Sequence, residues 1–242
     1  SLTIANSGGT LTGQGEWHEK GGKNTHSLHA DLKVHDAGVL LTELGYPNVL
    51  QKGNGEASVS LTWDGTPWSP VVSTIEGPVK VSLANGSFQQ VNTGVGGAVL
   101  SLLSMQSLLK RLQLDFSDLV QNGFSFDTLT SESKVVKGVA YTDGTKVIGS
   151  HASIISSGKV DFNTRTIDYD VLVLPDINAA GASIALAVVN PVAGIGSLVA
   201  QLLLRNPLSK IFSTEYKVQG SFDNPTIEKK SAASKTLEAA EK

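Results

Sequence analysis

The residues best suited to chemistry are histidines gathered near the start of the chain. Four of them fall within 18 residues: His18, His26, His29 and His35. Imidazole is a common zinc ligand, so a cluster of this density could form a metal centre. However, His29 and His35 share the polar face of a predicted strand with Asp31 and Lys33, and no spacing matches a helical zinc motif. We therefore expect solvated strand histidines and no bound metal.

Two glycine-rich segments resemble parts of known binding or catalytic motifs. Residues 94–97 (Gly-Val-Gly-Gly) lack the third glycine of a dinucleotide fingerprint, and no Lys-Ser/Thr pair follows them. Residues 194–197 (Gly-Ile-Gly-Ser) do not complete the Gly-x-Ser-x-Gly nucleophile elbow. Asp168 and Asp170 share one strand face, where we expect both carboxylates to be solvated. These observations predict no catalytic residues and no cofactor.

Composition narrows the classes of function further. The chain has 242 residues, of which 40% are hydrophobic and 17% charged, as in a folded protein of one large or two modest domains. A net charge of −3 without basic blocks argues against nucleic-acid binding. The sequence has no cysteine, which excludes disulfides and thiolate chemistry and suits an oxidising compartment. Because Ser1 begins directly in strand-like sequence, we expect a fragment of a longer chain.

Alternation of apolar and polar residues dominates the chain and predicts half-buried antiparallel strands. It is clearest at 27–35, 56–64, 167–173 and 216–222. Weaker candidates include separate strands at 79–83 and 87–91 and a single strand at 135–141. Turns are expected at five places: Gly21-Gly22, Asn54-Gly55, Asn85-Gly86, Asp143-Gly144 and Asn163. The pattern indicates a meander of about eleven or twelve strands.

Three helical segments are expected to interrupt these strands. Asp36 is the predicted N-cap of a short helix that ends before Gly45 and Pro47. Two apolar helices are predicted at 93–112 and 178–212, and residues 229–242 are expected to form a disordered polar tail. A membrane span needs about 20 continuous apolar residues. Pro191 divides the uncharged stretch 177–204 into halves of 13 residues, each only about 20 Å long as a helix.

The apolar face of each predicted strand must be covered. A closed barrel or a sandwich would cover it with other strands. An open curved sheet would instead leave an apolar groove of the kind that holds lipid. Periodicity alone does not distinguish these two architectures.

Several sequence blocks in the second half of the chain resemble a known family. They are 103–119 (Leu-Ser-Met-Gln-Ser-Leu-Leu-Lys-Arg-Leu-Gln-Leu-Asp-Phe-Ser-Asp-Leu) with 123–127, 158–162 with 169–175, 190–194, and 216–222 (Tyr-Lys-Val-Gln-Gly-Ser-Phe) with 224–225. In this order they resemble the C-terminal region of the AsmA-like family, above all its YhdP branch. The likeness covers roughly 85–229, whereas 1–84 share only the strand-and-turn style of the family.

The resemblance implies an inner-membrane-anchored periplasmic protein of Gram-negative bacteria, of which this chain is the outer-membrane-proximal end. The implied fold is mainly β with a few helices, a long antiparallel curved sheet forming an open, taco-like groove that carries phospholipid. Implied domains are groove repeats with one short helix at 1–92 and a C-terminal β region at 93–228. The implied partners are phospholipids, the inner leaflet of the outer membrane and the rest of the longer chain.

Two sets of candidate site residues follow from the resemblance. Groove candidates lie on the apolar strand faces: Leu28, Leu32, Val34, Val59, Leu61, Val79, Val81, Ile167, Tyr169, Val171 and Val173. Membrane-contact candidates lie in the apolar helices: Val95, Val99, Leu102, Leu103, Ile184, Leu186, Val188, Ile195, Leu198, Val199, Leu202 and Leu203. Two alternatives stay open: the helices could plug the groove, or the chain could be a structural or adhesin-like β-domain with a dry core and a helical lid.

Overall fold

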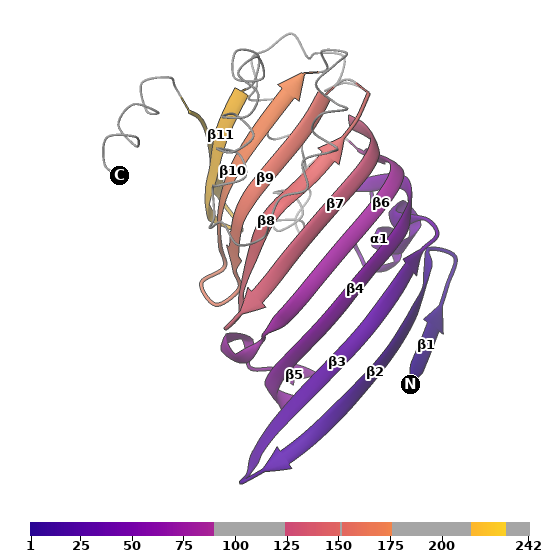
Figure 1. Ribbon diagram of the computed structural model, residues 1–242, viewed down its shortest axis with the longest axis vertical. Coiled ribbons are helices and arrows are strands. Elements are labelled where there is room, and N and C mark those ends of the chain that lie inside the picture. Colours follow the sequence, from indigo (N-terminus) through magenta and orange to yellow (C-terminus); the bar gives the residue numbers. More distant parts are fainter. Residues whose placement is uncertain (90–123, 151, 176–213, 231–242) are drawn as a thin grey trace.

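The computed structural model describes residues 1–89, 124–150, 152–175 and 214–230, which form one antiparallel sheet of twelve strands (Figure 1). The strands are β1 (Leu2–Ala5), β2 (Gly9–Lys20), β3 (Lys23–Val34), β4 (Leu50–Thr66), β5 (Ser69–Pro70), β6 (Gly77–Phe88), β7 (Phe124–Val136), β8 (Val139–Ile148), β9 (Ala152–Asp161), β10 (Thr166–Pro175), β11 (Thr214–Ser221) and β12 (Pro225–Lys229). Each strand pairs with its neighbours in sequence, except that β5 pairs only with β4 and β6 takes its place in the sheet. The predicted meander is confirmed.

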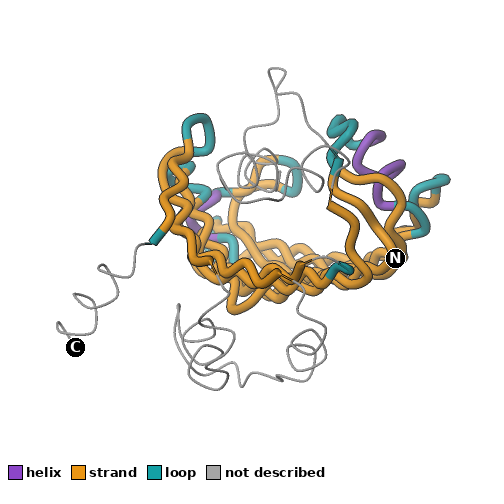
Figure 2. Tube along the Cα trace, turned by 90° about the horizontal axis from the view of Figure 1, so that it is seen from above, coloured by secondary structure: helices purple, strands orange, loops and turns teal. Residues whose placement is uncertain are grey.

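The sheet is curved and open. Its hydrogen-bonded path runs from β1 to β12 without a pairing between those two edges. Seen from above, the strands overlie one another along the base and rise on both sides, so that the sheet forms a trough (Figure 2). The open curved sheet expected from the family resemblance is therefore present, and the closed barrel is not.

The hairpins agree with the prediction at only some positions. Gly21 and Gly22 connect β2 to β3, and Asn163 lies in the turn between β9 and β10. A turn at Lys137-Gly138 separates β7 from β8 where one strand, 135–141, was predicted. Both turn residues have positive φ (52° and 74°), the backbone geometry of a tight two-residue hairpin.

Three predicted turns are wrong because those dipeptides lie inside strands. Asn54-Gly55 is within β4, Asn85-Gly86 within β6 and Asp143-Gly144 within β8. Accordingly, 79–83 and 87–88, predicted in separate strands, belong to one strand, β6, while residues 90 and 91 lie outside the described residues. Asn85 has the left-handed φ expected of a turn (56°), but β6 is paired on both sides, so the chain kinks without reversing.

The short helix predicted after Asp36 is confirmed as α1 (Ala37–Glu43). The Asp36 side chain accepts a hydrogen bond from the backbone N–H of Val39 (3.0 Å), as an N-cap does. The helix packs on the turn between β1 and β2, where a Cβ at Gly8 would lie 2.6 Å from the Leu40 nitrogen. A short 3-10 helix, η1 (Val72–Thr74), follows β5. The two predicted apolar helices lie outside the described residues, as does most of the predicted tail, and the domain division at residue 92 stays a prediction.

One face of the sheet is apolar from β2 to β12. Side chains inside a curved sheet converge and shield one another, whereas those outside diverge. Val34, Leu83 and Val147 are buried on the apolar face, while Lys33 and Ser82, which alternate with Val34 and Leu83, are exposed. We therefore assign the apolar face to the inside of the trough and call it the inner face; the opposite face is the outer face.

Candidate functional site

The pairing registers place all eleven groove candidates on the inner face. Residues directly opposite one another in an antiparallel sheet point to the same side. One row of such partners crosses the sheet through Val34, Gly55, Leu83, Leu129, Val147, Ile154 and Val173. Leu28 is opposite Leu61, and Val59 is opposite Val79, so the apolar strip continues toward the other end of the strands.

The inner face is more open on the N-terminal strands than on the C-terminal strands. Leu28, Leu61 and Val81 are half-buried, whereas Val171 and Val173 are 5% and 3% exposed. On β9 and β10 the outer face is buried as well; Ile155 and Leu172, which point outward, are 1% and 0% exposed there. The apolar surface still accessible to a ligand therefore lies mainly on β3, β4 and β6.

Glycines on the inner face lie beneath aromatic rings. A Cβ at Gly86 would be 2.9 Å from Cε1 of Phe126, and a Cβ at Gly158 would be 2.8 Å from Cγ of Tyr169. An aromatic ring that lies across a glycine on the neighbouring strand covers backbone that would otherwise be open. Phe126 also packs against Phe88, with ring centroids 5.3 Å apart. These rings cover the gaps that Gly86 and Gly158 would leave in the apolar floor.

Five hydroxyl side chains interrupt the apolar floor on β7, β8 and β10; we call them the hydroxyl patch: Ser131, Ser133, Thr142, Thr145 and Tyr169. Ser131 and Thr145 are hydrogen-bonded at 2.8 Å. Thr142 is bonded to Ser133 at 2.8 Å and to the Tyr169 hydroxyl at 2.9 Å. Burial raises the pKa of Tyr169, and its hydrogen bond to Thr142 opposes that rise only in part. Of these five residues, only Tyr169 lies in a strand predicted from the sequence, and no sequence signal indicates that the hydroxyl groups meet.

The four histidines do not converge on a common point. His26 is buried at 5% exposure between Trp17 and Trp63, with ring centroids 6.0 and 5.7 Å away, so the expected solvation of His26 is wrong. Its Nε2 lies 3.1 Å from the Gly65 carbonyl oxygen. His29 is exposed and contacts Ser60 on the outer face. Within the described ranges, no three potential metal ligands come together.

The expectation of freely solvated carboxylates at Asp168 and Asp170 is also wrong. Lys217 Nζ lies 2.5 Å from Asp168 and 3.4 Å from Asp170, and Lys230 Nζ lies 3.0 Å from Asp170. Burial by itself would lower the pKa of Lys217, but the hydrogen bond and charge of Asp168 and the charge of Asp170 outweigh it and raise that pKa. The cluster lies on the outer face because these residues alternate with Tyr169, Val171 and Val218. Its ion pairs stabilise the C-terminal strands.

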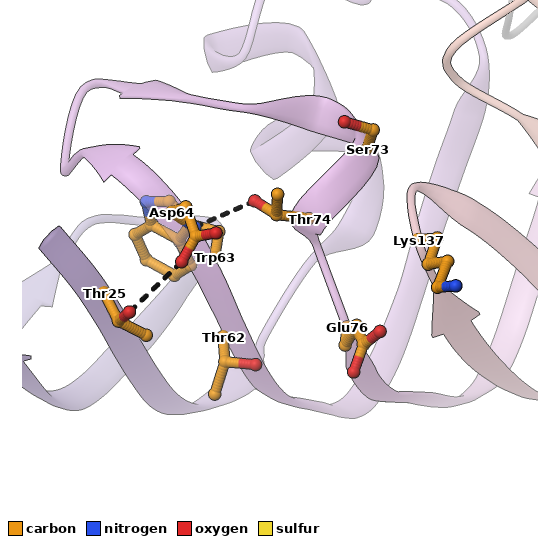
Figure 3. A pocket seen from close by; sticks show the side chains of 8 residues that line it. All are labelled: Thr25, Thr62, Trp63, Asp64, Ser73, Thr74, Glu76 and Lys137. Carbon is orange, nitrogen blue, oxygen red and sulfur yellow. Dashed lines mark hydrogen bonds between the residues drawn. The ribbon is translucent and has the colours of Figure 1, made fainter. Parts of the chain in front are cut away.

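A polar cavity of about 420 Å³ opens on the outer face near η1 (Figure 3). It is lined by Thr25, Thr62, Trp63, Asp64, Ser73, Thr74, Glu76 and Lys137. Asp64 accepts a hydrogen bond from Thr25 (3.1 Å), and its backbone N–H donates to Thr74 Oγ1 (2.8 Å). These bonds tie η1 to β3 and β4, so the lining groups are engaged in holding the fold. No sequence signal pointed to this cavity, because its residues come from four separate segments.

The membrane-contact candidates at 95–103 and 184–203 lie outside the described residues. Within the described ranges, no helix has the length and apolar character needed to cross a bilayer.

Comparison with known proteins adds to this geometry. The family model for the YhdP protein matches residues 1–227. The intermembrane phospholipid transporter YhdP of Escherichia coli (strain K12) is 31% identical over 217 residues, which cover 90% of this chain. The match spans only 17% of the length of that transporter. No solved structure matches the chain.

Proposed function

Since the chain belongs to the YhdP family, we propose that it is one segment of a bridge that carries phospholipid between two membranes, and that its inner face holds the acyl chains. The observation that carries this proposal is the half-buried apolar strip on β3, β4 and β6, on the inside of a sheet that does not close. The role is non-catalytic: the inner face offers a surface along which lipid moves without a change in covalent structure. A dry-cored structural domain is the less favoured reading, because the sheet is open and the relative is a transporter.

The energetics of lipid transfer require a surface of this kind. Exposing one CH₂ group to water costs about 0.8 kcal/mol, so a chain of about 14 such groups costs on the order of 11 kcal/mol in water. A continuous apolar strip removes most of that cost along the whole path. An open side leaves the charged headgroup in water, where it avoids the penalty of burying an ion.

The dimensions of the sheet agree with this use. Eleven strands on the hydrogen-bonded path, about 4.8 Å apart, give a trough about 48 Å long measured across the strands. One acyl chain occupies about half of the roughly 30 Å hydrocarbon core of a bilayer, or about 15 Å. The trough therefore has room for about three acyl chains end to end.

A pair of adjacent substitutions tests the proposal. Val81 is half-buried on the inner face, and Ser82 next to it is exposed on the outer face. We expect Val81→Asp to reduce the phospholipid recovered by native mass spectrometry about tenfold, since displacing two CH₂ groups costs about 1.6 kcal/mol. Ser82→Asp adds the same charge and should leave lipid recovery unchanged. Equal loss in both variants, or absence of lipid from the gently purified wild-type chain, would refute the proposed groove.

We also propose that the apolar segments 93–112 and 178–212 contact the outer membrane from the periplasm. This proposal is supported by their sequence, in which 28 residues at 177–204 carry no charge and Pro191 prevents one long helix. Burial of a few large aliphatic side chains at roughly 1.5–3 kcal/mol each would suffice for reversible attachment. Leu198→Glu with Leu202→Glu should abolish liposome flotation without changing the β circular dichroism. Loss of the β signal would instead identify 178–212 as a plug of the trough.

A further inference from the structure

The hydroxyl patch is a hydrogen-bonded polar cluster on a mainly apolar inner face, which also carries His26 and Ser156. Ser133, Thr142, Gly158 and Tyr169 are successive partners across β7, β8, β9 and β10. The Tyr169 ring crosses over Gly158, and this brings its hydroxyl within 2.9 Å of Thr142. Thr142 is 4% exposed although it carries a polar group. An apolar trough has no structural need for hydroxyls here, since valine would pack in the place of threonine.

The hydrogen bonds within the patch leave donors unused. The patch holds two separate networks: Ser131 with Thr145, and Ser133 with Thr142 and Tyr169. Each hydroxyl has one hydrogen to donate. The first network has two hydrogens and one internal bond, and the second has three hydrogens and two internal bonds. Each network therefore retains one hydrogen for a ligand that accepts.

The surroundings select a neutral acceptor. The charged side chains that alternate with the patch along the same strands point to the outer face: Glu132, Lys134, Lys146, Asp168 and Asp170. Asp143, in the β8 bulge between Thr142 and Thr145, is a carboxyl group and would not attract a phosphate. A phosphate oxygen on the inner face would thus meet no cation and would be buried at high cost. Ester carbonyl oxygens accept hydrogen bonds and carry no charge. A diacyl glycerolipid presents two of them close together, next to its apolar chains.

We propose that the hydroxyl patch binds the two ester carbonyls of a diacyl glycerolipid, one at each hydroxyl network, and so fixes where a lipid pauses in the trough. This inference rests on the proposed function. The acyl chains would extend over the half-buried apolar strip on β3, β4 and β6. The charged headgroup would stay in water on the open side of the trough.

A comparison of diester and diether lipids tests the inference. The probes are dioleoyl phosphatidylethanolamine and its dioleyl diether analogue, which has the same headgroup and chain length but no ester carbonyls. Binding of each to the 242-residue chain is measured by native mass spectrometry in competition. We expect the wild-type chain to prefer the diester about tenfold, from two hydrogen bonds. Ser131→Ala combined with Thr145→Val removes both hydroxyls of the first network and should reduce the preference to about threefold. Adding Ser133→Ala, Thr142→Val and Tyr169→Phe removes the second network and should bring the preference close to one without weakening diether binding.

The controls separate this inference from the proposed function. Tyr141→Phe removes an exposed tyrosine hydroxyl from β8 and should keep the preference of the wild type. The double variant Ser131→Ala and Thr145→Val tests the first network by itself if the fivefold variant does not fold. Equal binding of the two lipids by the wild type, or a preference unchanged in both the double and the fivefold variant, overturns the inference and leaves the proposed function standing. Failure to bind either lipid overturns both.

Discussion

Gly158 is the position at which the packing of the inner face can be tested most directly. Alanine there would place a Cβ 2.2 Å from the carbonyl oxygen of Asp168, 2.7 Å from Cα of Tyr169 and 2.8 Å from Cγ of Tyr169, all on the paired strand. The Cα belongs to backbone held on both sides, so the contact can be relieved only by separating β9 from β10 and shifting the ring of Tyr169.

The expected cost follows from three contributions. Overpacking of a tight interior costs about 1–3 kcal/mol. Separating the strands weakens a ladder hydrogen bond worth about 1 kcal/mol. The φ of Gly158 (+159°) is one that L residues rarely adopt, so alanine gains nothing from the lower entropy of the unfolded chain and adds backbone strain of about 1–3 kcal/mol. We therefore expect Gly158→Ala to lower the free energy of unfolding by about 4 kcal/mol, measured by urea denaturation followed by circular dichroism.

Gly13→Ala is the matched control. Gly13 lies on the inner face of β2, where a Cβ would be 3.4 Å from the Cβ of Ala30, an ordinary contact. Its unfolding free energy should be unchanged or slightly raised. A second readout is the tyrosinate titration: because burial raises the pKa of Tyr169, displacing the ring should lower that pKa toward 10.0. Equal unfolding midpoints for the two alanine variants, with an unaltered tyrosinate titration, would refute the packing described for Gly158.

Three further predictions concern the stability of the sheet. Phe126→Ala should lower the free energy of unfolding by about 3–5 kcal/mol, because Phe126 is 2% exposed and covers Gly86, whereas Phe162→Ala at 43% exposure should cost much less; urea denaturation compares them. Asp36→Ala should cost about 1 kcal/mol through loss of the α1 N-cap, and Asp36→Asn should restore most of it. The pKa of Lys217 is raised in the folded state, so the charged lysine stabilises the fold fully below about pH 10.5, and this stabilisation is lost as pH rises through the raised value. The unfolding free energies of the wild type and Lys217→Met should therefore converge above that pH. A constant difference would contradict the role of the ion pairs.

Alternation predicted the sheet because the physical cause is local. A strand with one face toward a core needs an apolar residue at every second position, and most of β3, β4 and β10 satisfies this. The N-cap of α1 was predictable for the same reason, since Asp36 bonds to a backbone N–H only three residues away. Whether the sheet closes depends on curvature, which no local pattern contains. The family resemblance decided that question.

The wrong predictions arose where neighbouring strands override local preference. Asn85-Gly86 has the composition of a hairpin turn, yet its pairing with β4 and β7 holds it inside a strand. Lys137-Gly138 has no strong turn signal in the sequence, because lysine is not a usual residue at positive φ. The hydroxyl patch combines residues 131 to 169 across three strands, so its recognition requires the register. His26 was misjudged because its ring partners, Trp17 and Trp63, come from the two flanking strands.

The strand order of the sheet follows the order of the chain, and this has a consequence for growth. Every long strand pairs with the long strands that come just before and just after it in the sequence. The sheet can therefore form strand by strand from one end while later residues are still being synthesised. A hairpin inserted at any rim would lengthen the trough by about 10 Å without disturbing distant pairings. The length of the trough can thus be changed one hairpin at a time.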